Sequence, residues 1–456
     1  MIRTSARAAL PLRCAALLIA ALLLLLGAGG VAQAQDNPID ISFGGRYRVR
    51  GFSLRNGTRP RQLDPLTRIA LRNAGKTDVD GRQNFLDTRL RLSLTAARGT
   101  ELALRTQFEI GDLVFGGSGA SLGTDGVNIE TKWLHLEWTP GALPLSMRAG
   151  LYSETTSRAL ILSDDVAGLR AEYKPFGGDL ILLAELIKAV DNSRVDLDND
   201  GIVDNDFNDR TIYYLRADYT KLRPFLFGAY GMSEIDNTGD TPVATNTERD
   251  VYWAGGFVEG QAGPVSFSVD GVYAFGDIRN GANPGSIRLE GYAFDARVAA
   301  ALPFITVETI LGWGSGDDPS TTANEAFPTI STFYAHSNII FDDYGGFNVT
   351  GSSISGVAHV SVILTSAPIP ELELKAIFVY ATYTEDPRRP TNVNRNLRSR
   401  DLGWEVGLNA NWIVNENFKL VTKNGIFFPM TGYETTFDTT ADDPLIEVIV
   451  GAEFNF

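Results

Sequence analysis

The segment Glu101-Leu-Ala-Leu-Arg-Thr-Gln-Phe-Glu-Ile110 alternates between apolar and polar residues. Successive side chains of a β-strand point to opposite faces, so the pattern predicts a strand with one apolar face and one charged face. The apolar face holds Leu102, Leu104, Phe108 and Ile110, and the polar face holds Glu101, Arg105, Gln107 and Glu109. A tilted strand needs about ten residues to cross a bilayer, which is the length of this segment.

The same alternation recurs along almost the whole chain and predicts an all-β fold. We expect a transmembrane antiparallel up-and-down β-barrel of about 18 strands, with 16 as the alternative count, since single-chain bacterial barrels have an even number. The apolar face would meet lipid, and closure would leave no strand edge unpaired. The expected strands cover residues 39–55, 84–97, 101–114, 127–139, 144–156, 165–175, 179–191, 209–220, 223–235, 249–261, 264–277, 286–301, 304–315, 353–366, 371–384, 402–413, 417–429 and 444–456.

The connections between these segments alternate in length. Short turns such as Arg98-Gly99-Thr100 and Ala262-Gly263 follow the even-numbered segments. Longer polar loops follow the odd-numbered ones, at 56–83, 115–126, 157–164, 192–208, 236–248, 278–285, 316–352, 385–401 and 430–443. Outer-membrane barrels have short periplasmic turns and long extracellular loops, whereas a soluble β-sandwich has no reason to sort its connections in this way.

The last segment is consistent with the same fold. Apolar residues at alternate positions from Ile446 lead to Phe454 and to the terminal Phe456, with Gly451 five residues before the end. This pattern resembles the C-terminal signal of outer-membrane barrels. The resemblance implies that Phe454 and Phe456 form an assembly signal for the barrel-assembly machinery.

Residues 1–34 are expected to be a cleaved secretory signal peptide. Arg3, Arg7 and Arg13 precede or flank the apolar run 15–27, and Ala32-Gln-Ala34 is the small-x-small pattern that export peptidases cut. Cleavage leaves 456 − 34 = 422 residues, the single barrel domain 35–456, and changes the formal charge from −15 to −15 − 3 = −18. It also removes the only cysteine, which excludes an internal disulfide. The acidic balance makes nucleic acid an unsuitable partner.

In such a barrel the charges on the alternate face point into the lumen. Arg46, Arg48 and Arg50 occupy three consecutive positions of that face on the first expected strand. A row of arginines would attract anionic solutes, whereas the alternative is that these charges only solvate a wet interior and pair with their neighbours. The predicted pore-lining residues are Arg46, Arg48, Arg50, Arg89, Arg91, Arg105, Arg148, Arg170, Asp270, Asp295, Glu308, Glu373 and Glu405.

The loop 192–208 contains alternating carboxylates followed by Gly201. This is the front half of a calcium loop, in which three acids and a backbone carbonyl bind the ion. Phe207 stands where an EF-hand has its bidentate acid, so the alternative is a solvated acidic loop. No other cofactor is expected. The candidate Ca²⁺ ligands are Asp196, Asp198, Asp200, the carbonyl of Ile202, and Asp204.

The loop that follows Gly312-Trp-Gly-Ser315 begins with Gly316-Asp-Asp-Pro319 and continues with Phe327-Pro-Thr329. This pattern resembles the alginate-export family of outer-membrane barrels. The stretch from Arg148 to Arg170 is also similar to a strand pair of that family. The resemblance implies an eighteen-stranded channel whose arginine-rich lumen passes an anionic polysaccharide.

These patterns favour an outer-membrane channel of a Gram-negative bacterium. Such a porin-like barrel would pass small hydrophilic or anionic solutes, or anionic saccharides in the manner of alginate export, and would contact outer-membrane lipid. The alternative is a structural or adhesive barrel that displays acidic extracellular loops. An enzyme is disfavoured, because His135, His336 and His359 are the only histidines and none lies in a nucleophile-elbow motif.

Overall fold

A computed structural model of the protein describes residues 38–56, 82–117, 129–141, 143–191, 209–238, 247–280, 283–342, 344–386, 399–433 and 443–456. The chain separates into two units, Met1–Ile39 and Asp40–Phe456. Nearly all of the first unit, including the expected signal peptide 1–34, lies outside the described residues. Within the described ranges, no helix is both long and apolar enough to cross a membrane.

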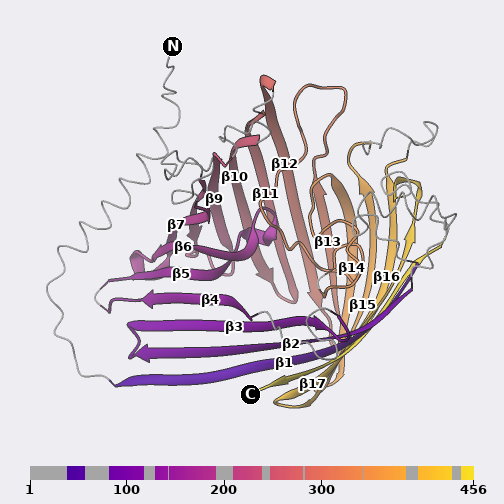
Figure 1. The fold of residues 1–456 in the computed structure, drawn as a ribbon, viewed down its shortest axis with the longest axis horizontal. Coiled ribbons are helices and arrows are strands. Elements are labelled where there is room, and N and C mark those ends of the chain that lie inside the picture. Colours follow the sequence, from indigo (N-terminus) through magenta and orange to yellow (C-terminus); the bar gives the residue numbers. More distant parts are fainter. Residues whose placement is uncertain are drawn as a thin grey trace. The chain divides into compact units, whose positions relative to one another are not determined.

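The described residues form eighteen strands and two short 3₁₀ helices, η1 (Ser157–Ala159) and η2 (Phe176–Gly178) (Figure 1). The strands are β1 (Ile39–Arg55), β2 (Gln83–Arg98), β3 (Leu102–Val114), β4 (Ile129–Trp138), β5 (Leu145–Thr155), β6 (Ser163–Tyr173), β7 (Leu180–Val190), β8 (Arg210–Tyr219), β9 (Leu226–Asp236), β10 (Thr247–Ala262), β11 (Val265–Asn280), β12 (Asn283–Ala301), β13 (Thr306–Gly314), β14 (Val357–Ile369), β15 (Leu372–Tyr383), β16 (Asp401–Asn415), β17 (Phe418–Pro429) and β18 (Leu445–Asn455).

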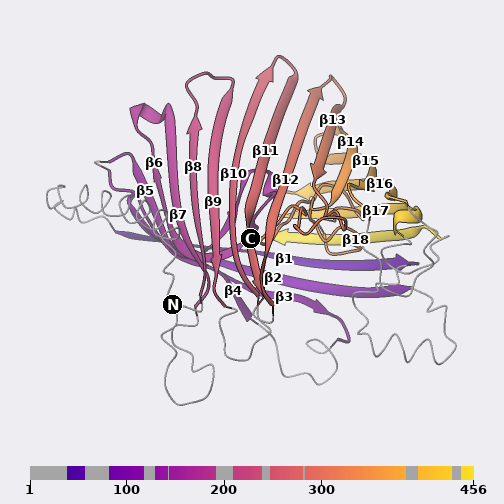
Figure 2. The same ribbon diagram turned by 90° about the horizontal axis from the view of Figure 1, so that it is seen from above.

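Each strand pairs with the next one along the chain, and β1 also pairs with β18. The β1–β18 pairing is antiparallel and places Tyr47 opposite Phe454. Figure 2 shows the run of neighbouring strands from β7 to β12, and Figure 1 shows indigo β1 beside the yellow C-terminal strands. The predicted all-β, antiparallel up-and-down barrel of 18 strands is therefore confirmed, and the alternative count of 16 is wrong.

One expected long loop is much shorter than the sequence indicates. Residues 278–285 were expected to connect two strands, but β11 continues to Asn280 and β12 begins at Asn283. These two strands have 16 and 19 residues, more than the roughly ten that cross a bilayer. The alternation of apolar and polar residues identifies the part of a hairpin that crosses a bilayer. It does not show how far the hydrogen bonds between the two strands continue beyond that part.

The two faces of the sheet differ in the way that the alternation predicts. On β18, Val448 and Val450 are exposed on the outer face, where lipid would cover them, whereas Glu447 and Glu453 are buried on the inner face. An apolar outer face and a polar inner face are the arrangement that a membrane barrel requires. The inner face therefore carries the charged residues that could act on a solute.

Two connections pack against the inner face of the barrel. We call residues 315–356, between β13 and β14, the inner loop, and residues 156–162, between β5 and β6, the short inner loop. The inner loop contributes Ile339, Ile340 and Phe341 to a buried apolar cluster that also contains wall residues of β15, β16 and β17. The short inner loop contributes residues 160–162 to the same cluster. The main hydrophobic core therefore lies inside the barrel.

The chain terminus closes the seam between β18 and β1. Phe456 donates a main-chain hydrogen bond to Gly45 O (3.0 Å), and Gly45 N donates one to Phe456 O (2.9 Å). The Phe456 ring also stacks on Phe454, with ring centroids 5.9 Å apart. The structure thus gives the predicted assembly-signal residues a position at the point where the barrel closes.

Deleting Phe456 should reduce the fraction of protein that reaches the folded barrel. The deletion removes two seam hydrogen bonds, each worth about 0.5–1.5 kcal/mol, and an aromatic contact. The measurement is the heat-modifiable band of outer-membrane fractions on a gel. Phe304→Ala, at a phenylalanine that is 87% exposed in the turn after β12, is the control and should assemble normally. Equal assembly of the deletion and the full chain would contradict a role for the terminal residue.

Candidate functional site

The inner loop is attached to the barrel wall by acidic side chains from β12, β16 and β18. Each of these acids accepts a hydrogen bond from the loop, and together they fix it at points distributed over the loop's length. A buried carboxylate is stable only when its oxygens have such donors. The contacts are the Tyr334 hydroxyl to Asp295 (2.6 Å), Asn338 N to Glu405 (2.8 Å), Phe347 N to Glu447 (2.7 Å) and the Tyr344 hydroxyl to Glu453 (3.1 Å).

Apolar packing holds the same loop in place between these polar contacts. Ile339, Ile340 and Phe341 are completely buried in the described structure. Burying one such side chain contributes about 1.5–3 kcal/mol, so these three residues help to hold the loop against the wall. The inner loop is therefore part of the folded core and narrows the lumen.

The short inner loop meets the inner loop within the barrel. Ile330 N donates to Ile161 O (3.0 Å), and Ser163 N donates to Ser331 O (2.6 Å). From the facing wall, the Trp253 indole donates to Pro328 O (3.0 Å). Both loops therefore reduce the free cross-section, and solutes would pass between them and the remaining wall.

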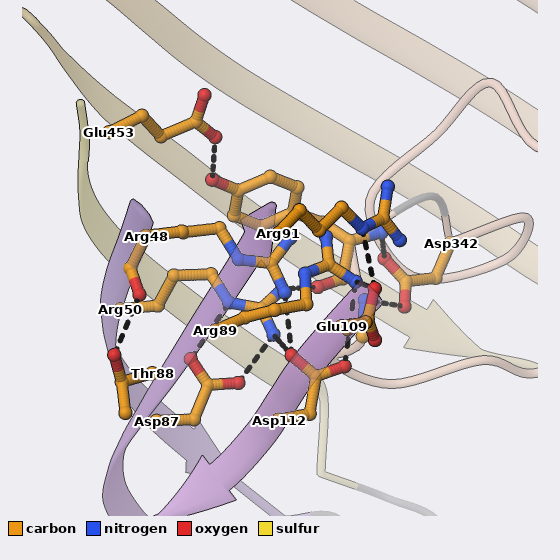
Figure 3. Close-up of polar contacts among 12 residues, drawn as sticks. Arg48, Arg50, Asp87, Thr88, Arg89, Arg91, Glu109, Asp112, Asp342 and Glu453 are labelled. Carbon is orange, nitrogen blue, oxygen red and sulfur yellow. Dashed lines mark hydrogen bonds and ion pairs between the residues drawn. The ribbon is translucent and has the colours of Figure 1, made fainter. Parts of the chain in front are cut away.

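That remaining wall carries the arginines of β1 and β2. Figure 3 shows Arg48, Arg50, Arg89 and Arg91 converging on Asp87, Glu109 and Asp112. The closest pairs include Arg48 with Asp112 (2.7 Å), Arg50 Nε with Asp87 (2.9 Å) and Arg91 with Glu109 (2.5 Å), while Arg89 lies 3.7 Å from Asp112 and 3.8 Å from Glu109. Four arginines and three carboxylates are therefore interleaved here, with Asp342 and Glu453 beside them in the same view.

Tyr344 brings the inner loop into contact with this basic cluster. Its main-chain oxygen accepts a hydrogen bond from Arg50. Its ring lies 4.9 Å from the Arg50 guanidinium, 5.5 Å from that of Arg48 and 4.3 Å from the Lys423 ammonium. Cations within about 6 Å of an aromatic face are attracted by it. Tyr344 therefore joins the loop to the arginine wall.

The inward-facing charges differ widely in exposure. The side chains of Arg105, Arg46, Arg148 and Arg91 are 45%, 41%, 32% and 30% exposed. Among the predicted acids, Asp270, Asp295 and Glu405 are 0% exposed, because Tyr230, Tyr334 and the inner loop cover them. Arg48 and Arg50 are also buried, whereas their partner Asp112 is 53% exposed. Among the predicted pore-lining residues, the most exposed charges are therefore basic.

The other predicted pore-lining residues lie in simple pairs. Arg105 and Arg148 both contact Glu137 on β4, at 2.7 and 3.0 Å. Arg170 pairs with Glu154, and Glu373 accepts a hydrogen bond from Asn411 (2.9 Å). Glu308 lies half-buried on β13. The predicted pore-lining set leaves out Asp87, Glu109, Asp112 and Tyr344, which complete the arginine cluster, although alternation places Glu109 on the polar face of its strand.

The candidate calcium ligands Asp196, Asp198, Asp200, Ile202 and Asp204 lie outside the described residues. In the ranges that the structure does describe, no group of three or more His, Cys, Asp or Glu side chains has the arrangement of a metal site.

Two of the three histidines lie where the inner loop meets the wall, His336 in the loop itself and His359 on β14. Ser361 Oγ is 3.0 Å from His336 Nε2 and 3.1 Å from His359 Nδ1, and the Tyr334 hydroxyl is 2.8 Å from His359 Nε2. Ser361 is 0% exposed, so no substrate reaches its hydroxyl. This Ser–His contact therefore serves to attach the loop.

No protein-family model and no curated protein sequence matches the chain. Solved structures do match its fold. A BenF-like porin from Pseudomonas fluorescens superposes with a TM-score of 0.54 at 11% identity, covering 91% of this chain and 98% of that one. OpdL of Pseudomonas aeruginosa gives 0.53 at 12% identity, covering 91% and 99%, and OccK11 (OpdR) of the same organism gives 0.53 at 11%, covering 91% and 96%.

These similarities establish the eighteen-stranded barrel fold over nine-tenths of the chain, and none of the three structures supports the resemblance to the alginate-export family. The chain is thus similar in fold to Pseudomonas outer-membrane porins.

Proposed function

We propose that this protein is a passive channel of the Gram-negative outer membrane that prefers small anionic solutes. The observation that carries the proposal is that solvent reaches the inward-facing Arg46, Arg91, Arg105 and Arg148, whereas the predicted pore-lining acids Asp270, Asp295 and Glu405 are covered. The fold similarity to a BenF-like porin supports the channel as the class of activity.

Charges close to the passage affect a solute more than the net charge of the whole chain does. The whole sequence has a formal charge of −15, which taken alone suggests a preference for cations. Salt screens charges beyond about 8 Å at physiological ionic strength, so distant acids act weakly on a solute in the passage. The nearest accessible charges decide selectivity. On the β1–β3 wall these are Arg46, Arg91 and Arg105 together with the carboxylate of Asp112.

The cellular setting follows from the same proposal. An exported barrel would lose residues 1–34 to signal peptidase, fold through the barrel-assembly machinery and sit in outer-membrane lipid. Export of an anionic polysaccharide would need a wide passage, and the two inner loops narrow this one. We therefore favour small hydrophilic and anionic solutes over a substrate of the alginate type.

Replacing Arg48 and Arg91 together by alanine should shift the reversal potential toward cations. The double substitution removes two positive charges and leaves Asp112 and Glu109 with fewer partners, so the local charge becomes more negative. Planar-bilayer recording under a salt gradient measures the shift. The matched control replaces Arg279 and Arg288, which are 56% and 72% exposed at the loop side of β11 and β12. An unchanged potential in the Arg48/Arg91 variant would mean that these arginines only solvate the lumen.

Acidification should loosen the inner loop. Burial holds the pKa of His336 well below its usual value, and the neighbouring His359 and Arg297 lower it further. In a released loop this imidazole would titrate near 6.5, so protons bind the released form more tightly. The packing of the inner loop against the wall therefore has its full stability above about pH 6.5. Below that pH, the free energy that holds the loop in place falls by up to roughly 1.4 kcal/mol per pH unit.

The measurement is single-channel conductance between pH 7.5 and 5. Conductance should rise or become noisy as the pH falls, and His336→Asn should reduce that response. His135→Asn is the control, since His135 lies on β4 away from the inner loop and should leave the acid response intact. A wild-type conductance that does not vary over this range would contradict the role of His336.

A further inference from the structure

Glu405 on β16 makes the most extensive polar contact of the inner loop that the structure describes. Its carboxylate accepts hydrogen bonds from three consecutive main-chain N–H groups, those of Asn338 (2.8 Å), Ile339 (3.2 Å) and Ile340 (2.8 Å), and from the Ser337 hydroxyl (3.0 Å). Consecutive N–H groups that point at one anion form a concave anion site of the backbone. Here the anion is a side chain of the wall, and Glu405 is 0% exposed.

The wall beside Glu405 is shaped to receive the same three loop residues. Gly407 on β16 lies directly opposite Gly425 on β17. A Cβ atom at 407 would lie 2.7 Å from Asn338 Nδ2, and one at 425 would lie 3.0 Å from Ile339 Cδ1. The distance at 407 is well inside van der Waals contact, so a side chain there would push against Asn338, whereas at 425 Ile339 would have to move by only a few tenths of an ångström.

Hydrogen bonds at this position fix the loop laterally as well. Asn338 and Asn409 on β16 exchange side-chain amide hydrogen bonds of 2.8 and 2.9 Å, and Asn338 Nδ2 also donates to Asn424 O on β17 (2.8 Å). We call Glu405, Gly407, Asn409, Asn424 and Gly425 the loop seat. Only β18 separates the loop seat from β1, and the loop extends from the seat to Tyr344 beside the arginines of β1.

We propose that Glu405 is the positioning residue of the channel. It holds the inner loop on the loop seat and thereby sets how closely Tyr344 approaches the arginine wall, although its own carboxylate never meets a solute. This proposal rests on the channel function proposed above. It states that one buried carboxylate, that of Glu405, controls the width of the passage. Loss of this carboxylate should release the loop even though every arginine is retained.

Glu405→Gln tests the proposal in single-channel recordings. An amide group replaces one acceptor oxygen by a donor that faces main-chain N–H groups, so the anion site is lost. If the loop leaves the seat, conductance should rise by roughly twofold, because current scales with the open cross-section. Glu371→Gln is the matched control, since Glu371 is exposed in the turn between β14 and β15, and the conductance of this variant should stay at the wild-type value.

Gly407→Val keeps the carboxylate and pushes the loop off the seat sterically. Valine is well tolerated in β-strands, so the barrel should still fold, and heat-modifiability checks this for each variant. This variant should also show increased conductance. Wild-type conductance in both folded variants would overturn the proposal.

A cross-link reports the loop position without any current. Asn338→Cys and Gly425→Cys would place two Cβ atoms about 3.1 Å apart, close to the roughly 3.8 Å of a disulfide. The only native cysteine is Cys14, so the pair would be the only one after signal cleavage. The disulfide should form in the otherwise wild-type protein and form severalfold less when Glu405→Gln is added.

The two readouts separate the possible failures. Absence of any channel current with efficient cross-linking would reject the proposed function and leave the role of Glu405 in positioning the loop intact. Equal cross-linking with and without Glu405→Gln would reject the positioning role, whatever the current.

Discussion

The pairing of β1 with β18 is the constraint on which the rest of the structure depends. In a bilayer an unpaired main-chain N–H or C=O group costs several kcal/mol, so a sheet in lipid must close on itself. Closure fixes the alternation of every strand relative to lipid and lumen. It also places the first strand, with Arg46, Arg48 and Arg50, beside Glu453 of the last.

Closure alone would give a wide lumen with bases and acids mixed along its wall. The inner loop changes this arrangement, because its donors cover Asp295, Glu405, Glu447 and Glu453 and its apolar residues fill the space beside β14–β18. Arg46, Arg91, Arg105 and Arg148 remain partly accessible. The anion preference proposed for this acidic chain depends on them, since what counts is the charge a solute can reach.

The sequence predicted the strands well because lipid imposes a strict period of two on each of them. The same alternation made it possible to count the strands and to recognise the last one, which ends at Phe456. Alternation also placed Glu405 and Asp295 on the inner face, where the structure has them. It could not show that the inner loop covers them there. Residues 316–352 were expected to be an extracellular loop, because the short apolar run Ile339-Ile-Phe341 carries no periodic signal of its destination. Likewise, Gly407 and Gly425 look like ordinary strand glycines until the loop that needs their space is known.

The most direct test of this account is the reversal potential of the unmodified protein in a planar bilayer, measured in potassium chloride gradients at high and low salt. The account predicts a preference for chloride that increases as salt is lowered, because weaker screening strengthens the accessible arginines. A preference for potassium at low salt would show that the acidic groups control the passage, and would contradict the central claim.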